Sequence, residues 1–307
     1  MKRTKKTILG IIITIVITGL LLIYYTFKNE LVSVSSNLNE LSGFEFDKEK
    51  NLWGINDSGN LPEIYQIDSV GNIEKTIKIT NAENIDWEDM TQDNKGNFYI
   101  GDFGNNLNKR KNLTIYKINN PTHIKGNETK AEIIRFKFED QFYFPEPKSD
   151  KNFDLEAFIF YKNELYLFTK NRTKPFDGQT HLYKVNNNAG NYKAKFISSV
   201  KTCSSNKYLC WITSAAINPS KNKIALMSSN KIFLLENWKG DDFFSGSIKE
   251  IDIGLVTQKE AITFYNDSII IYADEKFKKI GGNIYYLNIN KAIERRLNRA
   301  ETLKAPN

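Results

Sequence analysis

The chain has 307 residues, of which 40% are hydrophobic and 13% are aromatic, and it carries a formal net charge of +7. This apolar content is enough to bury a sizeable core, which excludes an intrinsically disordered chain, and the frequent Tyr, Phe and Ile residues favour β structure. The excess positive charge lies in residues 1–6 and 291–307, and the residues between them are about neutral. We therefore expect no nucleic-acid partner for the body of the protein.

The N-terminus predicts a membrane anchor. Residues 1–6, MKRTKK, form a basic head, and residues 7–27 are an uncharged run of 21 residues, long enough to cross a bilayer as one transmembrane helix. Tyr24, Tyr25 and Phe27 close the run like an interfacial belt, whereas a cleaved signal peptide usually has a shorter apolar run and a small-residue cleavage site. No cysteine lies near the run, which excludes a lipoprotein anchor. Because basic flanks stay in the cytoplasm, we expect a single-pass protein of the cell membrane whose remaining chain lies outside the cytoplasm.

Five copies of one hydrophobic pattern follow along the chain. The first strand of each copy begins near an equivalent position, and these positions are Ser42, Glu88, Glu156, Ser214 and Glu260. Fourteen residues later a polar residue ends the second apolar run of each copy, and these residues are Asn56, Asp102, Lys170, Ser228 and Asp274. A third apolar run follows in every copy, as in IYQI and IYKI. A constant offset in five copies predicts one repeated structural unit.

A fourth apolar run follows in four of the five copies, and the copies start 46, 68, 58 and 46 residues apart. Four antiparallel strands per repeat, joined by turn-rich loops, are typical of a β-propeller. We therefore predict an all-β fold, a five-bladed β-propeller of four-stranded blades over residues 30–290. Six blades are the alternative if the long segment 104–154 hides another blade.

The fifth copy lacks its fourth strand, because the chain beyond residue 290 is polar and helical in character. Residues 291–307 are therefore predicted to be a tail and not part of a blade. An uncovered sheet edge is a liability that folded domains avoid. Residues 30–36, ELVSVSS, precede the first copy and have the pattern of a lone strand. We expect this strand to pair with the last copy and to close the ring between the two ends of the chain.

Acidic residues are predicted to gather at one end of the propeller. The start of the first strand and the end of the second strand of every blade lie at the same mouth of the central channel. This geometry brings together Glu88, Glu156, Glu260, Asp102 and Asp274. Further polar residues lie close behind them in the sequence, and these are Asn84, Asp86, Asp89, Asp154, Asp57 and Glu275. Such a cluster repels itself unless a cation, shared protons or basic neighbours balance it.

A divalent-cation site is one interpretation of this cluster, because hard cations such as Ca²⁺ take carboxylate and amide oxygens as ligands. The predicted ligands are Glu88, Glu156, Glu260, Asn56, Asp102 and Asp274. The alternative is structural: the carboxylates cap strand ends by accepting hydrogen bonds from backbone N–H groups of the neighbouring blade. Both interpretations stay open at the level of sequence.

The two cysteines, Cys203 and Cys210, are separated by six residues in CSSNKYLC and are the only cysteines of the chain. An isolated pair in an exported domain predicts a disulfide across a loop. Two unpaired, partly buried thiols are the alternative. A metal site would need two further soft ligands, and none lies nearby in the sequence.

Several segments resemble the SdiA-regulated family of exported β-propellers and the related propellers labelled esterase-like phytase domains. The resemblance covers roughly residues 38 to 290, and its most specific parts are NDSG (56–59), DWED (86–89), GDFGNN (101–106) and the copy that contains LEAF. It implies a secreted or membrane-anchored propeller with a polar channel mouth suited to a divalent ion, and it supplies no established reaction. The chain departs from the family in the fourth copy, where Ser214 and Ser228 replace acidic positions.

Two classes of function follow from these features. The favoured one is a binding or scaffold module, whose propeller face takes a small molecule, a glycan or a protein. The alternative is a metal-dependent hydrolase of esters, lactones or phosphoesters, in which Asp86 or Asp89 acts as the base, or a glycosidase with two catalytic carboxyl groups. Serine-triad hydrolases, zincins and nucleotide hydrolases are disfavoured because GxSxG, HExxH and glycine-rich phosphate loops are all absent.

Overall fold

The computed structural model describes residues 30–202, 206–278 and 280–293. The predicted basic head and transmembrane helix, residues 1–6 and 7–27, lie outside this part of the chain, as does most of the tail from residue 291 to 307. Among the described residues no helix is both long and apolar enough to cross a membrane.

The fold is all-β and of the β-propeller kind, and its strands form antiparallel four-stranded units. The first unit comprises β2 (Leu41–Phe46), β3 (Leu52–Asn56), β4 (Glu63–Ile67) and β5 (Ile73–Ile79). The second comprises β6 (Trp87–Gln92), β7 (Phe98–Asp102), β8 (Leu113–Ile118) and β10 (Glu132–Phe138). The third comprises β11 (Asp154–Tyr161), β12 (Glu164–Lys170), β13 (Gln179–Asn186) and β14 (Gly190–Lys201).

The remaining strands continue the same pattern. The fourth unit comprises β15 (Ser214–Ile217), β16 (Lys223–Met227), β17 (Lys231–Glu236) and β18 (Ser247–Asp252). The fifth comprises β19 (Lys259–Phe264), β20 (Ile269–Asp274), β21 (Asn283–Asn288) and β1 (Glu30–Ser33). Short helices lie in the connections, namely η1 (Ser36–Leu38), η2 (Pro121–His123), η3 (Lys148–Asp150), α2 (Lys207–Cys210) and η4 (Phe243–Ser245).

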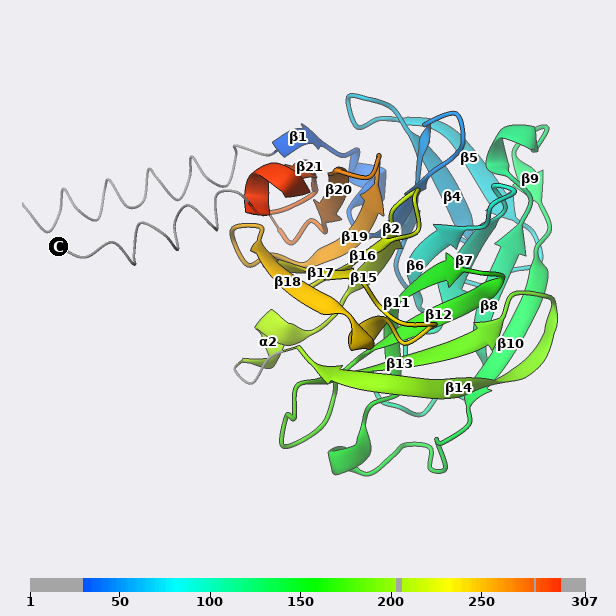
Figure 1. Cartoon of the computed structure of the whole chain (residues 1–307). Helices are drawn as coiled ribbons and strands as arrows, with labels where there is room; N and C mark the ends of the chain where they lie inside the picture. Colours follow the sequence, from blue (N-terminus) through cyan, green and yellow to red (C-terminus); the bar gives the residue numbers. More distant parts are fainter. Residues whose placement is uncertain (1–29, 203–205, 279, 294–307) are drawn as a thin grey trace, which may run out of the picture.

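The units are arranged in a ring around their first strands. β2 contacts β6, β6 contacts β11, β11 contacts β15, β15 contacts β19, and β19 contacts β2. Figure 1 shows these inner strands near the centre of the molecule, with the outer strands β5, β14 and β18 around them. The first strands therefore surround a common axis, and their ends meet at its two mouths.

The ring is closed by the chain ends, as predicted for residues 30–36. β1 pairs in antiparallel fashion with β21, and its register places Val32 opposite Ile284 and Ser33 opposite Asn283. The two strands lie side by side in Figure 1 although they are about 250 residues apart in sequence. The last unit thus receives its fourth strand from the N-terminal side of the chain, and its outer edge is covered.

Two outer-edge pairings were not predicted. β10 pairs in parallel with β14, which merges the second and third units into one eight-stranded sheet. The short strand β9 (Glu128–Thr129) pairs in parallel with β5 and extends the first unit. The long segment 104–154 is therefore occupied by β8, β9 and β10 and by their connections.

Apolar clusters fill the spaces between neighbouring units. The cluster between the first and second units contains Trp53, Ile55, Trp87, Phe98 and Ile100, all of them buried. Corresponding clusters lie between the other adjacent units of the described chain. Because each sheet is covered on both faces, inner strands are almost continuously buried, and β11 is buried at every position.

Candidate functional site

β-bulges place four of the five equivalent side chains predicted from the repeat. Ser42, Glu88, Glu156 and Glu260 are each the residue skipped in the pairing between the first and second strands of a unit. A bulge inserts one extra residue and turns its side chain out of the regular alternation. All four side chains line one cavity of about 200 Å³ at the mouth of the channel. The repeat therefore identified positions that are structurally equivalent.

Ser214, the fifth of these positions, is different. It pairs with Met227 in regular register, without a bulge, and it does not line the cavity. Its Oγ donates a hydrogen bond to Oδ1 of Asp89 at 3.1 Å. The fourth unit therefore contributes no side chain from this repeat position to the cavity.

Charged side chains dominate the cavity. The residues that line it are Ser42, Asp57, Glu88, Asn106, Glu156, Lys170, Arg172, Gln258, Glu260 and Glu275. Five of these residues carry carboxyl groups and two carry permanent or near-permanent positive charge. The predicted convergence of acids at one mouth is therefore observed, together with two basic residues.

One side of the cavity is neutralised by the protein itself. Lys170 Nζ lies 2.7 Å from Glu156 Oε2, and Arg172 contacts Asp154 Oδ2 at 2.6 Å and Glu156 Oε1 at 3.2 Å. Burial opposes the charge of Lys170, yet the carboxylates of Glu156 and Glu260 prevail and raise its pKa. Because both oxygens of Glu156 are engaged in ion pairs, the structure does not support its predicted role as a cation ligand.

Three acids at or beside the cavity have no ion-pair partner among the described residues: Asp57 and Glu88 line the cavity, and Asp86 lies next to them. One carboxylate oxygen each from Asp57, Asp86 and Glu88 lies within 4.8 Å of the others. Within the described part of the chain, no hydrogen-bond donor contacts the carboxylates of Asp86 and Glu88, although Glu88 is buried. Three carboxylates this close together repel one another, and the binding of protons or of a cation would relieve that repulsion.

Gly104 explains part of the GDFGNN motif. A Cβ atom at this position would lie 2.1 Å from Glu88 Oε1 and 2.4 Å from Asp86 Oδ2. The two carboxylates therefore occupy the space of the missing side chain. Any other residue at position 104 would push them apart, because carbon and oxygen atoms that are not bonded stay more than about 3 Å apart.

Burial and mutual repulsion raise the pKa values of the cavity acids. Burial, followed by repulsion from Asp86 and Glu156, raises the pKa of Asp57 to about 7. Burial, followed by repulsion from Asp57 and Glu156, raises the pKa of Glu275 to about 8. The pKa of Glu88 is also raised well above its usual value, first by burial and then by Glu156. Without a bound cation, Asp57 and Glu275 therefore titrate close to neutral pH.

Asn56 and Asp102, two predicted cation ligands, do not line the cavity. Asn56 Nδ2 donates to the backbone oxygen of Asn37 at 2.8 Å. Asp102 Oδ1 accepts hydrogen bonds from Arg110 at 2.8 Å and from the backbone N–H of Asp86 at 3.1 Å. Neither residue therefore faces this cavity, so the cavity gives no support to their predicted role as cation ligands, and Asp102 holds the backbone of Asp86 in place.

Asp274 is also turned away from the cavity. Its Oδ1 accepts from the backbone N–H of Asn283 at 3.1 Å, and its Oδ2 accepts from the Tyr285 hydroxyl at 3.1 Å. Glu275, the next residue, lines the cavity in its place, just as Asp57 does next to Asn56. Successive side chains of a strand point to opposite sides, so the prediction missed these positions by one residue.

Asp89, one of the two predicted bases, is buried inside the channel and does not line the cavity. Its Oδ2 accepts hydrogen bonds from the backbone N–H groups of Phe158 at 3.1 Å and Ala215 at 3.2 Å. Its Oδ1 accepts from Met90 N at 2.9 Å and Ser214 Oγ at 3.1 Å. Asp89 therefore links β6 to β11 and β15, and this structural role does not fit a base in contact with substrate.

Other cavity residues were not predicted at all. Arg172 follows the second strand of the third unit by two positions, Asn106 ends the GDFGNN motif, and Gln258 precedes the fifth unit. Only the basic KNR sequence at 170–172 carried a signal, because buried acids need positive neighbours. Cys203 lies outside the described residues, so its disulfide with Cys210 stays a prediction.

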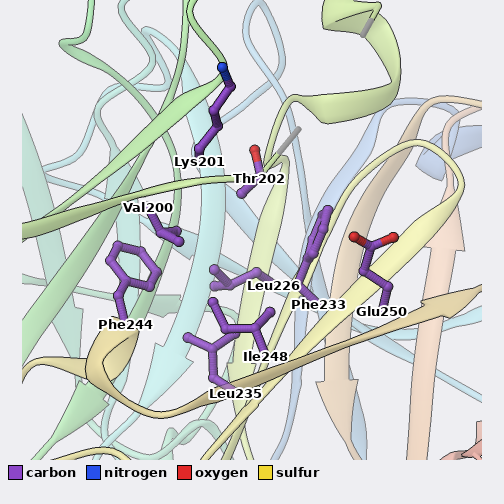
Figure 2. Close-up of a pocket in the computed structure, with 9 residues that line it drawn as sticks. All are labelled: Val200, Lys201, Thr202, Leu226, Phe233, Leu235, Phe244, Ile248 and Glu250. Carbon is purple, nitrogen blue, oxygen red and sulfur yellow. The ribbon is translucent and has the colours of Figure 1, made fainter. Parts of the chain in front are cut away.

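A second hollow lies away from this cavity, between β14 and the β17–β18 pair (Figure 2). It has a volume of about 170 Å³, and its floor contains Leu226, Phe233 and Leu235. Its charged groups, Lys201 and Glu250, belong to different strands. No group of acids converges there, so the candidate site is the cavity at the channel mouth.

Comparisons with known proteins add little to this geometry. No family model matches the sequence, and comparison with curated proteins gives no significant match. The resemblance to the SdiA-regulated family therefore stays a prediction.

Solved structures of similar shape are distant. Virginiamycin B lyase from Staphylococcus aureus is 14% identical, with a TM-score of 0.39 over 80% of this chain and 65% of that protein. A streptogramin B lyase is 14% identical, with a TM-score of 0.40 over 86% of this chain and 74% of that protein. A PQQ-bound aldose sugar dehydrogenase from Streptomyces coelicolor is 8% identical, with a TM-score of 0.46 over 84% and 97% of the two chains. At these values the function has to be argued from the chain's own residues.

Proposed function

We propose that this protein is a binding module whose channel mouth holds a divalent cation, with Ca²⁺ as the candidate, and binds an oxygen-bearing ligand through it. The observation that carries the proposal is the convergence of Asp57, Asp86 and Glu88 within 4.8 Å, beside the space left by Gly104. Among the described residues, Asp57 accepts one hydrogen bond, from the backbone N–H of Ser58, and the carboxylates of Asp86 and Glu88 accept none, so their oxygens are open to a hard cation.

The donor set fits this cation better than others. Its three groups supply oxygen atoms only, and neither histidine of the chain lines the cavity. Oxygen-only donor sets favour Ca²⁺, Mg²⁺ or Mn²⁺ over zinc or copper. Ca²⁺ takes 6 to 8 oxygen ligands, so water and ligand oxygens would complete its coordination. Glu260 lines the same cavity and is available as a further ligand, whereas Glu156 is held by Lys170 and Arg172.

A metal-dependent hydrolase of esters, lactones or phosphoesters is the second candidate. The observation that favours it is the presence of two acids, Asp57 and Glu275, with pKa values of about 7 and 8 in one cavity. Groups that titrate near the working pH are suited to general acid–base chemistry. A bound cation would polarise the substrate oxygen, and Asp86 replaces Asp89 as the candidate base because it belongs to the cation cluster of Asp57, Asp86 and Glu88. We rank the binding module first because the cavity contains no histidine and no obvious nucleophile.

The same proposal includes the number of blades and the location of the protein. Five strand units in a closed cycle, with β1 completing the last one, support a five-bladed propeller. We further propose that residues 7–27 anchor the chain in the cell membrane, with the propeller outside the cytoplasm, where Cys203 and Cys210 can pair. A reporter fused after Asn307 should then be active only on the outer side. Activity of a cytoplasmic reporter at that position would contradict the location.

Calorimetric titration of the protein with Ca²⁺ tests the proposed function. Glu88→Gln should weaken binding by about tenfold or more, because it removes one charged ligand. The cation-free protein should become slightly more stable, because one member of a repelling cluster is neutralised. Glu49→Gln is a matched control, since Glu49 is exposed and lies in the turn after β2. If Glu88 instead caps backbone N–H groups, the same substitution lowers the stability of the cation-free protein and leaves Ca²⁺ binding unchanged.

Turnover separates the two candidates. The protein should be assayed with lactones, aryl esters, phosphoesters and aryl glycosides, with and without Ca²⁺. A binding module gives no turnover on any of them. In a hydrolase, Asp86→Asn should reduce kcat strongly, and stimulation by Ca²⁺ that persists in this variant would exclude Asp86 as the base.

A further inference from the structure

A larger pocket opens beside the acidic cavity. It has a volume of about 530 Å³. Five residues belong to the walls of both hollows, namely Lys170, Arg172, Gln258, Glu260 and Glu275. The two hollows therefore share one wall of polar side chains, and a ligand at the cavity can extend directly into the pocket.

A second group of side chains in this pocket forms an apolar wall that is largely exposed. It contains Tyr208, Trp211, Val256, Phe277 and Ile280. Tyr208 is 56% exposed, Val256 55%, Phe277 61% and Ile280 66%. These side chains come from three separate loop segments, after β14, before β19 and after β20, yet they line one pocket. Exposed apolar side chains that gather around a concave surface mark a binding site.

Trp211 is held in a fixed position within this wall. Its Nε1 donates to the backbone oxygen of Asn171, and the Arg172 guanidinium lies 4.5 Å from the centre of its ring. Tyr208 packs edge-on against it at 5.0 Å between ring centres. A tryptophan fixed by a hydrogen bond, a cation and a second ring offers a preorganised apolar surface. The same Arg172 also reaches the ion pairs of the cavity, so the apolar wall and the charged wall are connected.

Five residues of the pocket carry charged groups, namely Lys170, Arg172, Lys259, Glu260 and Glu275. Lys259 Nζ, deeper in the pocket, is already committed to the Leu255 oxygen at 2.7 Å, Thr257 Oγ1 at 2.7 Å and the Ser229 oxygen at 3.1 Å. The other charged groups of the pocket are Lys170, Arg172, Glu260 and Glu275, and all four lie in the wall shared with the cavity, where Lys170 and Arg172 are ion-paired with Glu156. The arrangement therefore fits a molecule with one polar end and one apolar end.

We propose that this pocket is a subsite for the apolar part of an amphipathic small molecule, an aryl- or alkyl-chain carboxylate, whose carboxylate end is bound at the cation. The proposal rests on the proposed function for the polar end only. The apolar end depends on Trp211, Val256, Phe277 and their neighbours, independently of the cation. A negatively charged head matches a divalent cation with Lys170 and Arg172 beside it. Apolar contact of the tail with the pocket wall then adds affinity in proportion to the area removed from water.

The test compares carboxylates that differ in their tails. The full chain in lipid nanodiscs is titrated with Ca²⁺, and then, in the presence of Ca²⁺, with 4-phenylbutyrate or acetate. 4-Phenylbutyrate should bind at least about tenfold more tightly than acetate, because its ring and chain enter the pocket. Val256→Asp should remove this preference and leave Ca²⁺ binding unchanged. Val70→Asp is the matched control, because Val70 is 62% exposed in the turn between β4 and β5, away from the pocket.

A neutral probe distinguishes failure of the pocket from failure of the cation site. 4-Phenylbutyramide, titrated without Ca²⁺, should still bind the wild type and the Val70→Asp variant more tightly than the Val256→Asp variant. If Ca²⁺ does not bind but this difference is found, the cation site is wrong and the apolar subsite stands. Equal affinities for 4-phenylbutyrate and acetate, or an unchanged preference in Val256→Asp, would overturn the subsite.

Discussion

Replacing Gly104 by alanine is the sharpest test of the cation cluster. The added methyl group would lie 2.1 Å from Glu88 Oε1 and 2.4 Å from Asp86 Oδ2, so both carboxylates must retreat by about 1 Å to restore van der Waals contact. Moving one carboxylate oxygen from about 2.4 Å to about 3.4 Å from a divalent ion loses about 4 kcal/mol at an effective dielectric constant of about 20. That loss corresponds to about a thousandfold in affinity if nothing relaxes.

Relaxation of the two side chains reduces this figure, so the expected loss of Ca²⁺ affinity is about thirtyfold or more. Calorimetric titration measures it directly, and the melting temperature of the cation-free protein reports any general damage. Gly126→Ala is the control: Gly126 has a φ of +80° and nothing within 4 Å of an added Cβ. It should lose about 1 kcal/mol of stability from its left-handed backbone and keep its Ca²⁺ affinity. A Gly104→Ala variant that binds Ca²⁺ as tightly as the wild type would refute the placement of the ion beside Glu88 and Asp86.

Three further predictions concern pH, the channel and ring closure. The pKa values of Asp57 and Glu275 are raised in the folded, cation-free protein, so it binds these protons more tightly than the unfolded chain does. Its melting temperature should therefore fall as pH rises from about 5 to 8. The Ca²⁺ affinity should increase over the same range, because the ligands lose their protons. Asp89→Ala should lower the free energy of unfolding by about 3 kcal/mol or more, measured by urea denaturation, because buried N–H groups of β11 and β15 lose their acceptor. Deleting residues 30–36 should lower the free energy of unfolding by several kcal/mol in the same assay, since β21 loses its partner strand. An unchanged denaturation midpoint would show that β1 does not close the ring.

The repeated unit could be predicted from sequence because its signal is local. Each inner strand is apolar enough to be covered on both faces, and the turns between strands are marked by Gly, Asn, Asp and Pro. The parallel pairings of β10 with β14 and of β5 with β9 had no such signal. These pairings depend on where two outer strands, separated in sequence, come to lie in the folded protein. No residue pattern within either strand predicts that position.

Two predicted cavity positions, Asn56 and Asp274, each lie one residue from a residue that lines the cavity, for a definite reason. A bulge at Ser42, Glu88, Glu156 or Glu260 adds one residue to the first strand, and simple alternation then assigns the wrong side chain of the second strand to the same face. The ion pairs of Arg172 were missed because they join residues brought together only by the fold, although the need for nearby positive charge could be stated in advance.

The asymmetry of the channel mouth connects these observations. On the side of the third unit, Lys170 and Arg172 neutralise Glu156 and Asp154, so the protein supplies its own cations there. On the side of the first and second units, the acids of the cation cluster have no ion-pair partners among the described residues, and either protons or the proposed cation would balance them. The fourth unit has no acid at either repeat position.

Its contribution to the mouth lies instead in the larger pocket. Thr213 and Ser229, the neighbours of the two serines that replace acids in the fourth copy, line that pocket beside Trp211. The unit that lacks acids at both repeat positions is therefore also the unit that lies beside the apolar wall of the larger pocket. Restoring the repeat with Ser228→Asp would place a buried charge without a cation beside this wall. We expect weaker binding of 4-phenylbutyrate with little change in Ca²⁺ affinity, and a Ser228→Asp variant that instead binds Ca²⁺ more tightly would show that the fourth unit belongs to the cation site after all.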